Sequence, residues 1–403
     1  MPESVPSDIL LLIFEKIVGG EMNQWPDAQY DKERAAAPFL LAAVCQTWRL
    51  LTRSSSHFWT YFGFPKSTSL SPRHLERLNV LLAVSSNAPV DVVLDLFWDE
   101  PDSGWSRLEP DPRIHACAHI VRAINDIGAR WRHVHLRLSL KPMELLCGSL
   151  QSSLPGIQSL SIQSEVPWNM IPRGPQLSRL YVDCEEFDKE ARWGQDSPGR
   201  PILTNLAIMA NINHGEKMFR ALSGSVGQQL RKLCLLDICP SGGNWPTIEL
   251  NLLETLTVVD GWYLKVISAQ NLLHLQLDAS SLPPFVEEEN FPRVETVTLF
   301  DIIDSYSFKS LSLLTKVCTL NIALPTSVKM SSSPGNVVTY VANGAWSAFD
   351  EPTFWPHLHC IRILDKDEDL EDTYHITELR ETVRRRNYDI ASTGLIEYVV
   401  VLC

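Results

Sequence analysis

The sequence predicts an α/β protein in which a short helical module at the N-terminus precedes an irregular stack of short parallel strands. Two observations lead to this prediction. Apolar residues recur at helical spacing within the first 65 residues, and a spacing typical of short buried strands recurs along most of the remaining chain. The predicted division is residues 1–65 for the helical module and 66–403 for the strand repeat with its C-terminal cap.

The composition is that of a folded protein in a reducing compartment. Hydrophobic residues make up 45% of the chain and charged residues 21%, which is ordinary for a globular protein. The formal net charge of -13 disfavours a broad nucleic-acid interface, because phosphate backbones are negative. The nine cysteines are scattered without a C-x-x-C pair, as buried thiols are. With no membrane-length apolar run or signal-peptide pattern, we expect a cytoplasmic or nuclear protein without membrane or nucleic-acid partners.

The first 65 residues predict two helices followed by an aromatic segment. Capping oxygens at Ser7 and Asp8 precede an apolar run over residues 9–17, and a glycine pair then ends the helix. A second helical pattern covers residues 38–51, with its proline in the first turn, and aromatic residues cluster over 58–64. So short a module buries little surface, and composition alone favours a cap on the next domain.

The same residues resemble the F-box. The family pattern is leucine-proline, an apolar helix containing isoleucine-phenylalanine, then valine-cysteine-x-x-tryptophan and a later tryptophan; here Val5-Pro6 and Val44-Cys45-x-x-Trp48 match it. In that family the segment docks onto a Skp-type adaptor and, through it, a cullin. The adaptor-binding residues that the resemblance implies are Pro6, Ile9, Leu10, Ile13, Phe14, Leu41, Val44, Cys45, Trp48 and Trp59.

Two departures from the F-box pattern are visible. Val5 stands where the family has leucine, and the segment between Gly19 and Ala37 is longer than the family's usual link between its first two helices. The longer link is similar to that of the fungal F-box-like subset.

After the module, the pattern predicts a helix over 73–86, a strand over 90–97, a helix over 113–131 and a strand over 134–140. From there apolar residues recur at positions 1, 4 and 6 of a short window, an L-x-x-L-x-L spacing. The windows are Trp131-Val134-Leu136, Ile157-Leu160-Ile162, Leu177-Leu180-Val182, Leu203-Leu206-Ile208, Leu230-Leu233-Leu235, Leu253-Leu256-Val258, Leu272-Leu275-Leu277, Val294-Val297-Leu299, Val317-Leu320-Ile322 and Leu358-Ile361-Ile363.

Successive windows mostly start about 19 to 27 residues apart, close to the leucine-rich repeat period of 20–29. Positions 4 and 6 lie on one face of a strand, so stacked units share a continuous core. We therefore predict an irregular leucine-rich-repeat solenoid, a horseshoe of short parallel strands, with Val337-Tyr340 interpreted as a degenerate copy. A helix over 373–387 and a strand over 395–403 would cap it. The alternative is an ordinary parallel α/β sheet, disfavoured by gaps too short for a crossover helix.

Catalytic and metal-binding motifs are absent, so we predict a protein that is not an enzyme and needs no cofactor or metal. His115, Cys117 and His119 are interpreted as one helix face, and the acidic run over 365–372 as a solvated loop. Tryptophans are frequent at binding hot spots. The candidate target-binding residues after predicted strands are Trp168, Trp193, Trp245, Trp262 and Trp346.

Two functional hypotheses follow, and a third is distant. The resemblance implies the substrate-recognition subunit of a cullin-type ubiquitin ligase, which binds an adaptor through the helices and an unidentified target protein through the repeats. The alternative is a non-catalytic repeat scaffold whose F-box-like segment is only a cap, with Ile9, Ile13 and Trp48 packed inward. An enzyme on an α/β sheet would require a deep pocket with converging ionisable groups.

Overall fold

The structure is a computed structural model, which describes residues 5–19, 30–66, 70–96, 112–138, 146, 154–163, 174–183, 202–209, 222–224, 226–236, 247–283, 286–300, 302–303, 305–323, 340–341, 346, 349, 354–365, 374–389 and 397–402. It forms two compact units. Unit 1 comprises Met1–Ala191 and Asp196–Leu203, and unit 2 comprises Arg192–Gln195 and Thr204–Cys403. The predicted mixed α/β class with short parallel strands is confirmed in both.

The sheet of unit 1 is parallel, and its strands pair in chain order. Two columns of apolar side chains cross it in register: one joins Phe62 to Leu180, and the other joins Phe64 to Val182. Every side chain in these columns is buried, because they point to the same face of successive strands. The strands are β1 (Tyr61–Phe64), β2 (Val90–Leu96), β3 (Trp131–Leu138), β4 (Ser159–Gln163) and β5 (Arg179–Asp183).

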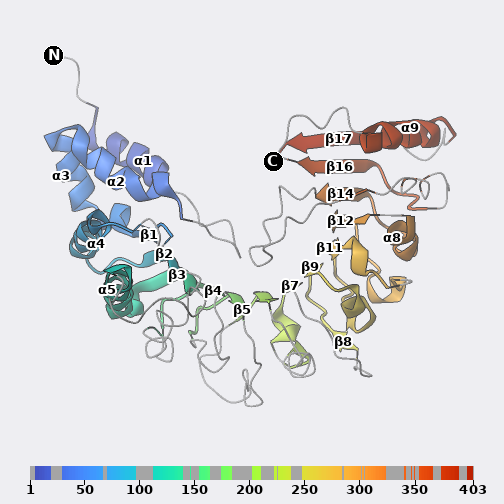
Figure 1. Cartoon of the computed structure of the whole chain (residues 1–403), viewed down its shortest axis with the longest axis horizontal. Helices are drawn as coiled ribbons and strands as arrows, with labels where there is room; N and C mark the ends of the chain where they lie inside the picture. Colours follow the sequence, from blue (N-terminus) through green and yellow to red (C-terminus); the bar gives the residue numbers. More distant parts are fainter. Residues whose placement is uncertain are drawn as a thin grey trace. The chain divides into compact units, whose positions relative to one another are not determined.

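The helices of unit 1 form two groups around this sheet. In Figure 1, α4 and α5 lie on one side of β2 and β3, while α1, α2 and α3 gather beside β1. The helices are α1 (Ser7–Val18), α2 (Lys32–Val44), α3 (Gln46–Ser54), α4 (Pro72–Ser85) and α5 (Pro112–Asp126), with short 3-10 turns η1 (Ser56–Trp59) and η3 (Gly128–Arg130).

The predicted helix boundaries in the module need two corrections. The cap of α1 is Pro6, and no side chain caps the helix, so Ser7 and Asp8 lie in its first turn. The second predicted helix is two helices: α2 begins at Lys32, six residues before Pro38, because Asp31 accepts a hydrogen bond from the Arg34 amide at 2.8 Å. The extended backbone of Cys45 then separates α2 from α3.

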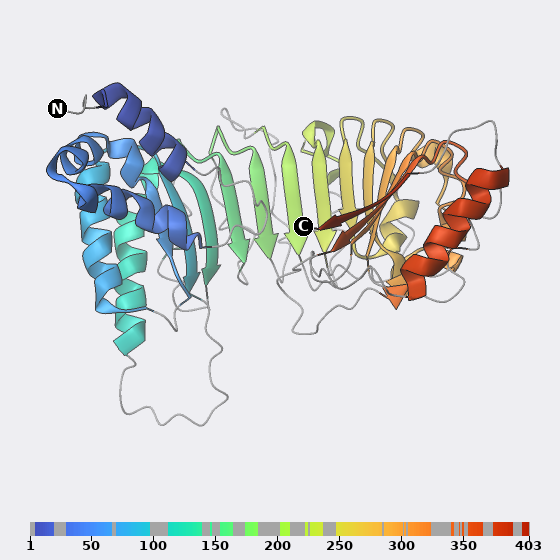
Figure 2. The same ribbon diagram turned by 90° about the horizontal axis from the view of Figure 1, so that it is seen from above.

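Unit 2 repeats the parallel arrangement over more strands, which Figure 2 shows side by side. Residues at window positions 4 and 6 again form two buried columns, from Leu206 to Ile361 and from Ile208 to Ile363. The paired strands, in sheet order, are β6 (Asn205–Met209), β7 (Lys232–Leu236), β9 (Thr255–Val258), β11 (His274–Asp278), β12 (Thr296–Phe300), β14 (Thr319–Ala323), β16 (Cys360–Asp365) and β17 (Glu397–Leu402).

The connections of unit 2 hold short elements and one longer helix, α9. The predicted copy at Val337-Tyr340 is wrong: Tyr340 pairs with Ile302 in a separate two-stranded sheet, while β14 pairs directly with β16. Val337 itself lies outside the described residues. The remaining elements are η5 (Gly227–Gln229), β8 (Ile248–Glu249), η6 (Gly261–Lys265), β10 (Ile267–Ser268), η7 (Ala279–Ser281), η8 (Glu288–Asn290), β13 (Ile302–Ile303), α8 (Ser305–Ser310), β15 (Tyr340–Val341) and α9 (Tyr374–Asp389).

Helix length bears on membrane insertion. Over the residues described, none of the helices has both the length and the apolar character needed to cross a bilayer.

Because the apolar columns bury one face of each strand, substitutions on the two faces should differ strongly in their effect on the free energy of unfolding. Replacing the buried Leu256 with alanine should lower the free energy of unfolding by about 2–5 kcal/mol, through lost apolar contacts and a residual cavity. Replacing its half-buried neighbour Thr257, on the opposite face, should cost less than about 1 kcal/mol. Urea unfolding of both variants measures the difference, and equal losses would contradict the assignment of the faces.

Candidate functional site

The module of α1, α2 and α3 is held together by an aromatic core. The Phe14 ring meets the Trp48 ring edge-on at 4.8 Å between centroids and the Phe58 ring at 6.1 Å. Phe39 packs on Trp59 at 5.1 Å, and the Trp59 indole N–H donates to the Thr52 carbonyl at 2.8 Å. These contacts join all three helices to η1, so the module is a packed body.

The outer face of α1 is apolar and open to solvent. Ile9, Leu12, Ile13 and Ile17 keep 48%, 58%, 44% and 51% of their surface exposed. At 3.6 residues per turn these positions fall within an arc of about 140°, so they form one stripe. The buried Phe14 lies outside this stripe, on the inward side.

Helices α2 and α3 also carry exposed apolar side chains. Leu40, Val44 and Leu50 are each more than 60% exposed, and Val5 just before α1 is also exposed. Of the thirteen large hydrophobic residues that are exposed in the described chain, these eight lie between residues 5 and 50. We call them the apolar face; its members are Val5, Ile9, Leu12, Ile13, Ile17, Leu40, Val44 and Leu50.

The residues expected to bind an adaptor take three different places. Pro6, Ile9, Ile13, Val44 and Cys45 are exposed. Leu10 and Trp48 are half-buried, whereas Phe14, Leu41 and Trp59 are buried and shape the module from inside. Helical spacing from Ile9 identifies Leu12 and Ile17 as further exposed positions, and spacing from Val44 identifies Leu40. Leu50 lies on α3, beyond the break at Cys45, so spacing along α2 does not reach it.

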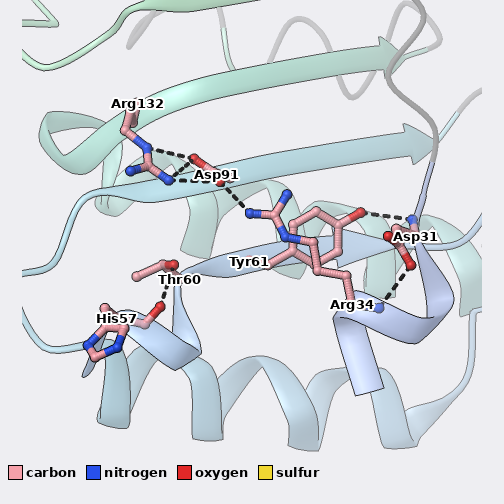
Figure 3. Close-up of polar contacts among 7 residues, drawn as sticks. All are labelled: Asp31, Arg34, His57, Thr60, Tyr61, Asp91 and Arg132. Atoms are coloured by element: carbon pink, nitrogen blue, oxygen red, sulfur yellow. Dashed lines mark hydrogen bonds and ion pairs between the residues drawn. The ribbon is translucent and has the colours of Figure 1, made fainter. Parts of the chain in front are cut away.

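A charge network fastens the module to the edge of the sheet (Figure 3). The Asp91 side chain on β2, only 2% exposed, accepts a hydrogen bond from the Arg34 guanidinium of α2 at 2.7 Å. Arg132 of β3 binds the same carboxylate through Nε at 2.9 Å and through a terminal nitrogen at 3.0 Å. A buried carboxylate requires such partners, because desolvation disfavours its charge.

The local backbone places both arginines. Between β2 and β3 the register shifts, so that Val90 pairs with Trp131 but Asp91 pairs with His133. Arg132 is the extra residue of this β-bulge, and a bulge turns side chains from their regular alternation. On α2, the Arg34 amide is the one that the Asp31 cap holds.

Tyr61 completes the network from β1. Its ring lies 4.5 Å below the Arg34 guanidinium, and its hydroxyl accepts a hydrogen bond from the Asp31 amide at 2.9 Å. Burial is the main cause that raises the pKa of Tyr61 to about 12. The phenol is therefore neutral at physiological pH, so it adds no charge beside Asp91.

Helix α4 also contacts α2. Arg77 donates a hydrogen bond to the Ala35 carbonyl, and its guanidinium lies 5.3 Å from the centre of the Phe39 ring. The module is thus fixed by charged contacts from both β2 and α4 while its apolar face stays open.

The opposite face of the unit 1 sheet carries buried polar groups. His135 on β3 is 5% exposed and shares a hydrogen bond of 2.9 Å with the Ser161 hydroxyl on β4. Ser159, Gln163 and Tyr181 on the same face are also buried. Burial, assisted by the Arg137 charge, lowers the pKa of His135 to about 4, so this side chain is neutral.

The other candidate residues do not converge on a site in the described chain. Trp262 is half-buried with its ring edge-on to Tyr263 at 5.7 Å, and Trp346 is buried. The described residues hold no group of three His, Cys, Asp or Glu that could bind a metal. Cys117 is buried and His119 exposed. Outside the described residues or side chains lie Trp168, Trp193, Trp245, His115 and 366–372.

In comparison with known proteins, no protein-family model matches the chain, and no curated protein matches it.

Removing the carboxylate at the centre of the network should loosen the module. Asp91→Ala leaves the nearly buried Arg34 without its counter-charge and should cost about 3–5 kcal/mol of unfolding free energy. Hydrogen exchange should rise in α2 and β1. Glu254→Ala, which breaks the exposed pair with Arg231, is the control and should cost about 1 kcal/mol or less. Equal effects of the two substitutions would refute a structural role for Asp91.

The buried His135 predicts acid sensitivity. Its folded-state pKa of about 4 lies below the unfolded value of 6.5, so the unfolded chain takes up a proton first as the pH falls. Stability should therefore be full above pH 6.5 and decline towards pH 4, by up to about 3 kcal/mol. His135→Asn should flatten this dependence in pH-resolved thermal unfolding, and His274→Asn, at an exposed strand position, should not. An unchanged slope in His135→Asn would exclude this histidine as the cause.

Proposed function

We propose that the chain is a substrate-recognition subunit of a Skp/cullin/F-box-type ubiquitin ligase and has no catalytic centre of its own. The apolar face of α1–α3 would dock onto a Skp-type adaptor, and the strand repeat would bind a target protein. The F-box resemblance of residues 5–59 suggests the partner, and the exposed apolar face supports a docking role.

The observation that carries the proposal is the outward orientation of Ile9 and Ile13. Each apolar square ångström left in water forgoes about 25 cal/mol, so a concentrated apolar surface is characteristic of an interaction site. The alternative of a purely structural cap requires Ile9, Ile13 and Trp48 to pack inward. Trp48 does pack on Phe14, as that alternative requires. Ile9 and Ile13 are instead 48% and 44% exposed, which favours docking over capping for α1.

Helix α2 also covers the edge of the sheet, as the scaffold alternative expects. Ala35 packs in a buried cluster with Tyr61 and Val93, and Arg34 binds Asp91. This side of α2 covers the β1 edge of the sheet. Leu40 and Val44 are at least 61% exposed and do not take part in that contact. Capping therefore accounts for the inner side of α2 and leaves its outer side for a partner.

The proposed mode of docking is helix-in-groove recognition. Apolar anchors at i, i+4 and i+8 on α1 would enter a hydrophobic groove of the adaptor, with Leu40 and Val44 extending the contact. Recognition of this kind needs a rigid donor surface, because ordering flexible side chains and loops weakens binding. Phe14 and Trp48 supply that rigidity by packing beneath the stripe.

The target-binding part is proposed to be an irregular leucine-rich-repeat solenoid. The in-register columns of window positions 4 and 6 support this assignment, as does the short link between β9 and β11. That link holds only the 3-10 turn η6 and the two-residue strand β10 among its described elements. A conventional parallel sheet would place a full crossover helix there.

The docking proposal is tested by retention on an immobilised Skp-type adaptor. Ile9→Asp/Ile13→Asp puts two carboxylates into the apolar stripe and should reduce retention at least about tenfold, since each buried isoleucine contributes about 1.5–3 kcal/mol. Phe14 and Trp48 are left intact, so the module should keep its core. Thermal unfolding of both chains checks this.

The matched control is Leu252→Asp/Leu313→Asp, which changes two exposed apolar residues of unit 2 with 48% and 45% exposure. This variant should bind the adaptor as the native chain does. Failure of the folded native chain to bind any Skp-type adaptor would reject the ligase proposal, and equal losses in both double variants would reject the apolar face as its docking site.

A further inference from the structure

The strands of unit 2 carry a ladder of polar side chains on the face opposite the apolar columns. Two in-register rows cross the strands from β7 to β16. We call them the polar rows. The first row is Lys232, Thr255, His274, Thr296, Thr319 and Cys360, and the second is Cys234, Thr257, Gln276, Thr298, Asn321 and Arg362.

The polar rows are accessible. Lys232, His274 and Arg362 are exposed, and of the other members only Cys360 is buried. The equivalent face of unit 1 differs, because His135 and Ser161 there are 5% and 2% exposed. Polar groups inside a protein are normally paired internally, whereas polar groups on an open sheet face are available to a partner.

Hydrogen bonds within the second row engage two of its acceptors, and the unpaired side-chain oxygen of Asn321 is buried. Thr257 donates to the Gln276 side-chain oxygen at 2.9 Å, and the Asn321 amide donates to the Thr298 hydroxyl oxygen at 3.2 Å. The acceptors of Gln276 and Thr298 are therefore engaged. The Gln276 NH2 group and the Thr298 O–H have no hydrogen-bond acceptor among the described residues.

Charge adds to this donor character. Lys232 lies at the β7 end of the rows and Arg362 at the β16 end, and neither forms an ion pair within the described chain. No carboxylate belongs to the two rows between them. Asp278 lies on the same face beyond Gln276, where its carboxylate accepts hydrogen bonds from the Ser280 amide and hydroxyl. In a chain of net charge -13, the two rows themselves are locally cationic, so they complement acceptors and carboxylates.

The dimensions of the rows suit an extended chain. Five strand-to-strand steps of about 4.8 Å separate β7 from β16, or about 24 Å in all. An extended peptide spans that distance with about seven residues. Nucleic acid fits less well, because it carries one charge per about 1.7 Å and would meet only two cations.

We infer that the polar rows of unit 2 bind an extended acidic peptide segment of a partner protein, about seven residues long, which crosses the strands between Lys232 and Arg362. Its carboxylates pair with the two cations, and its main-chain carbonyls accept hydrogen bonds from Gln276 and Thr298. The inference deepens the target-binding part of the proposed function and rests on it only for the identity of the partner as a ligase target.

The test is selection of a random seven-residue peptide display library on the immobilised full-length chain, followed by fluorescence polarisation with an enriched peptide. Enrichment of peptides with carboxylates near both ends is expected. Arg362→Glu should weaken binding at least about tenfold, and Gln276→Leu should weaken it several-fold. A peptide with lysine in place of the acidic residue facing Arg362 should regain affinity for Arg362→Glu.

Lys316→Glu is the matched control, because it makes the same charge reversal at an exposed lysine outside the polar rows. It should bind the peptide as the native chain does. The inference is overturned if no acidic peptides are enriched, if the two charge reversals act alike, or if a single-stranded oligonucleotide displaces the peptide.

Assaying Ile9→Asp/Ile13→Asp with the same peptide separates this inference from adaptor docking. Peptide binding should survive in that variant. Peptide binding without adaptor retention by the native chain would reject the ligase proposal and keep the peptide site, and adaptor retention without any acidic peptide would do the reverse.

Discussion

The burial of a single carboxylate, Asp91, is the constraint that organises the N-terminal half of the molecule. A charge that is 2% exposed must be compensated, and here a helix and a neighbouring strand each provide an arginine. Because Arg34 must reach Asp91, one side of α2 is fixed against β1 and β2. The helices packed on α2 then have only their remaining sides free, and on α1 that side is the apolar stripe. The orientation of the proposed docking surface is thus a consequence of an ion pair that does not belong to it.

A second constraint governs the strands. Each strand alternates between a core side chain and an outward one, so in-register pairing places every core residue in one of two columns. The columns fix the stacking of the strands, and they place no demand on the opposite face. That face can therefore differ along the chain. In unit 1 it buries the His135–Ser161 pair, whereas in unit 2 it presents hydrogen-bond donors and cations.

The strand columns could be predicted from sequence because the pattern that specifies them is local. The spacing of Leu256 and Val258, within three residues, predicts both a strand and the face that it buries. The error at Tyr340 arose because local spacing cannot show which strand a segment pairs with.

The prediction that a helix begins at Pro38 was wrong for a related reason. A proline favours a first turn, but the Asp31 cap starts α2 earlier and tertiary contacts from Asp91 and Arg77 stabilise the helix around it. In the candidate site, spacing predicted helical segments over residues 9–17 and 38–51 but not which of their residues face outward. The inward turn of Phe14 and Trp59 depends on packing between helices, and the role of Asp91 depends on a bulge; neither is visible in a pattern of apolar residues.

The two proposed surfaces rely on different physics, and this makes their binding events separable. The apolar face of α1–α3 carries four exposed residues on α1 alone, and burying them releases water without matching charges. The polar rows work through donors and two cations, whose attraction weakens as salt screens it. Added salt should therefore weaken one contact and leave or strengthen the other. Under the proposed function, this difference would let a target dissociate without disturbing the adaptor. The net charge of -13 is consistent with this division, since repulsion over the rest of the surface would limit acidic partners to the locally cationic face.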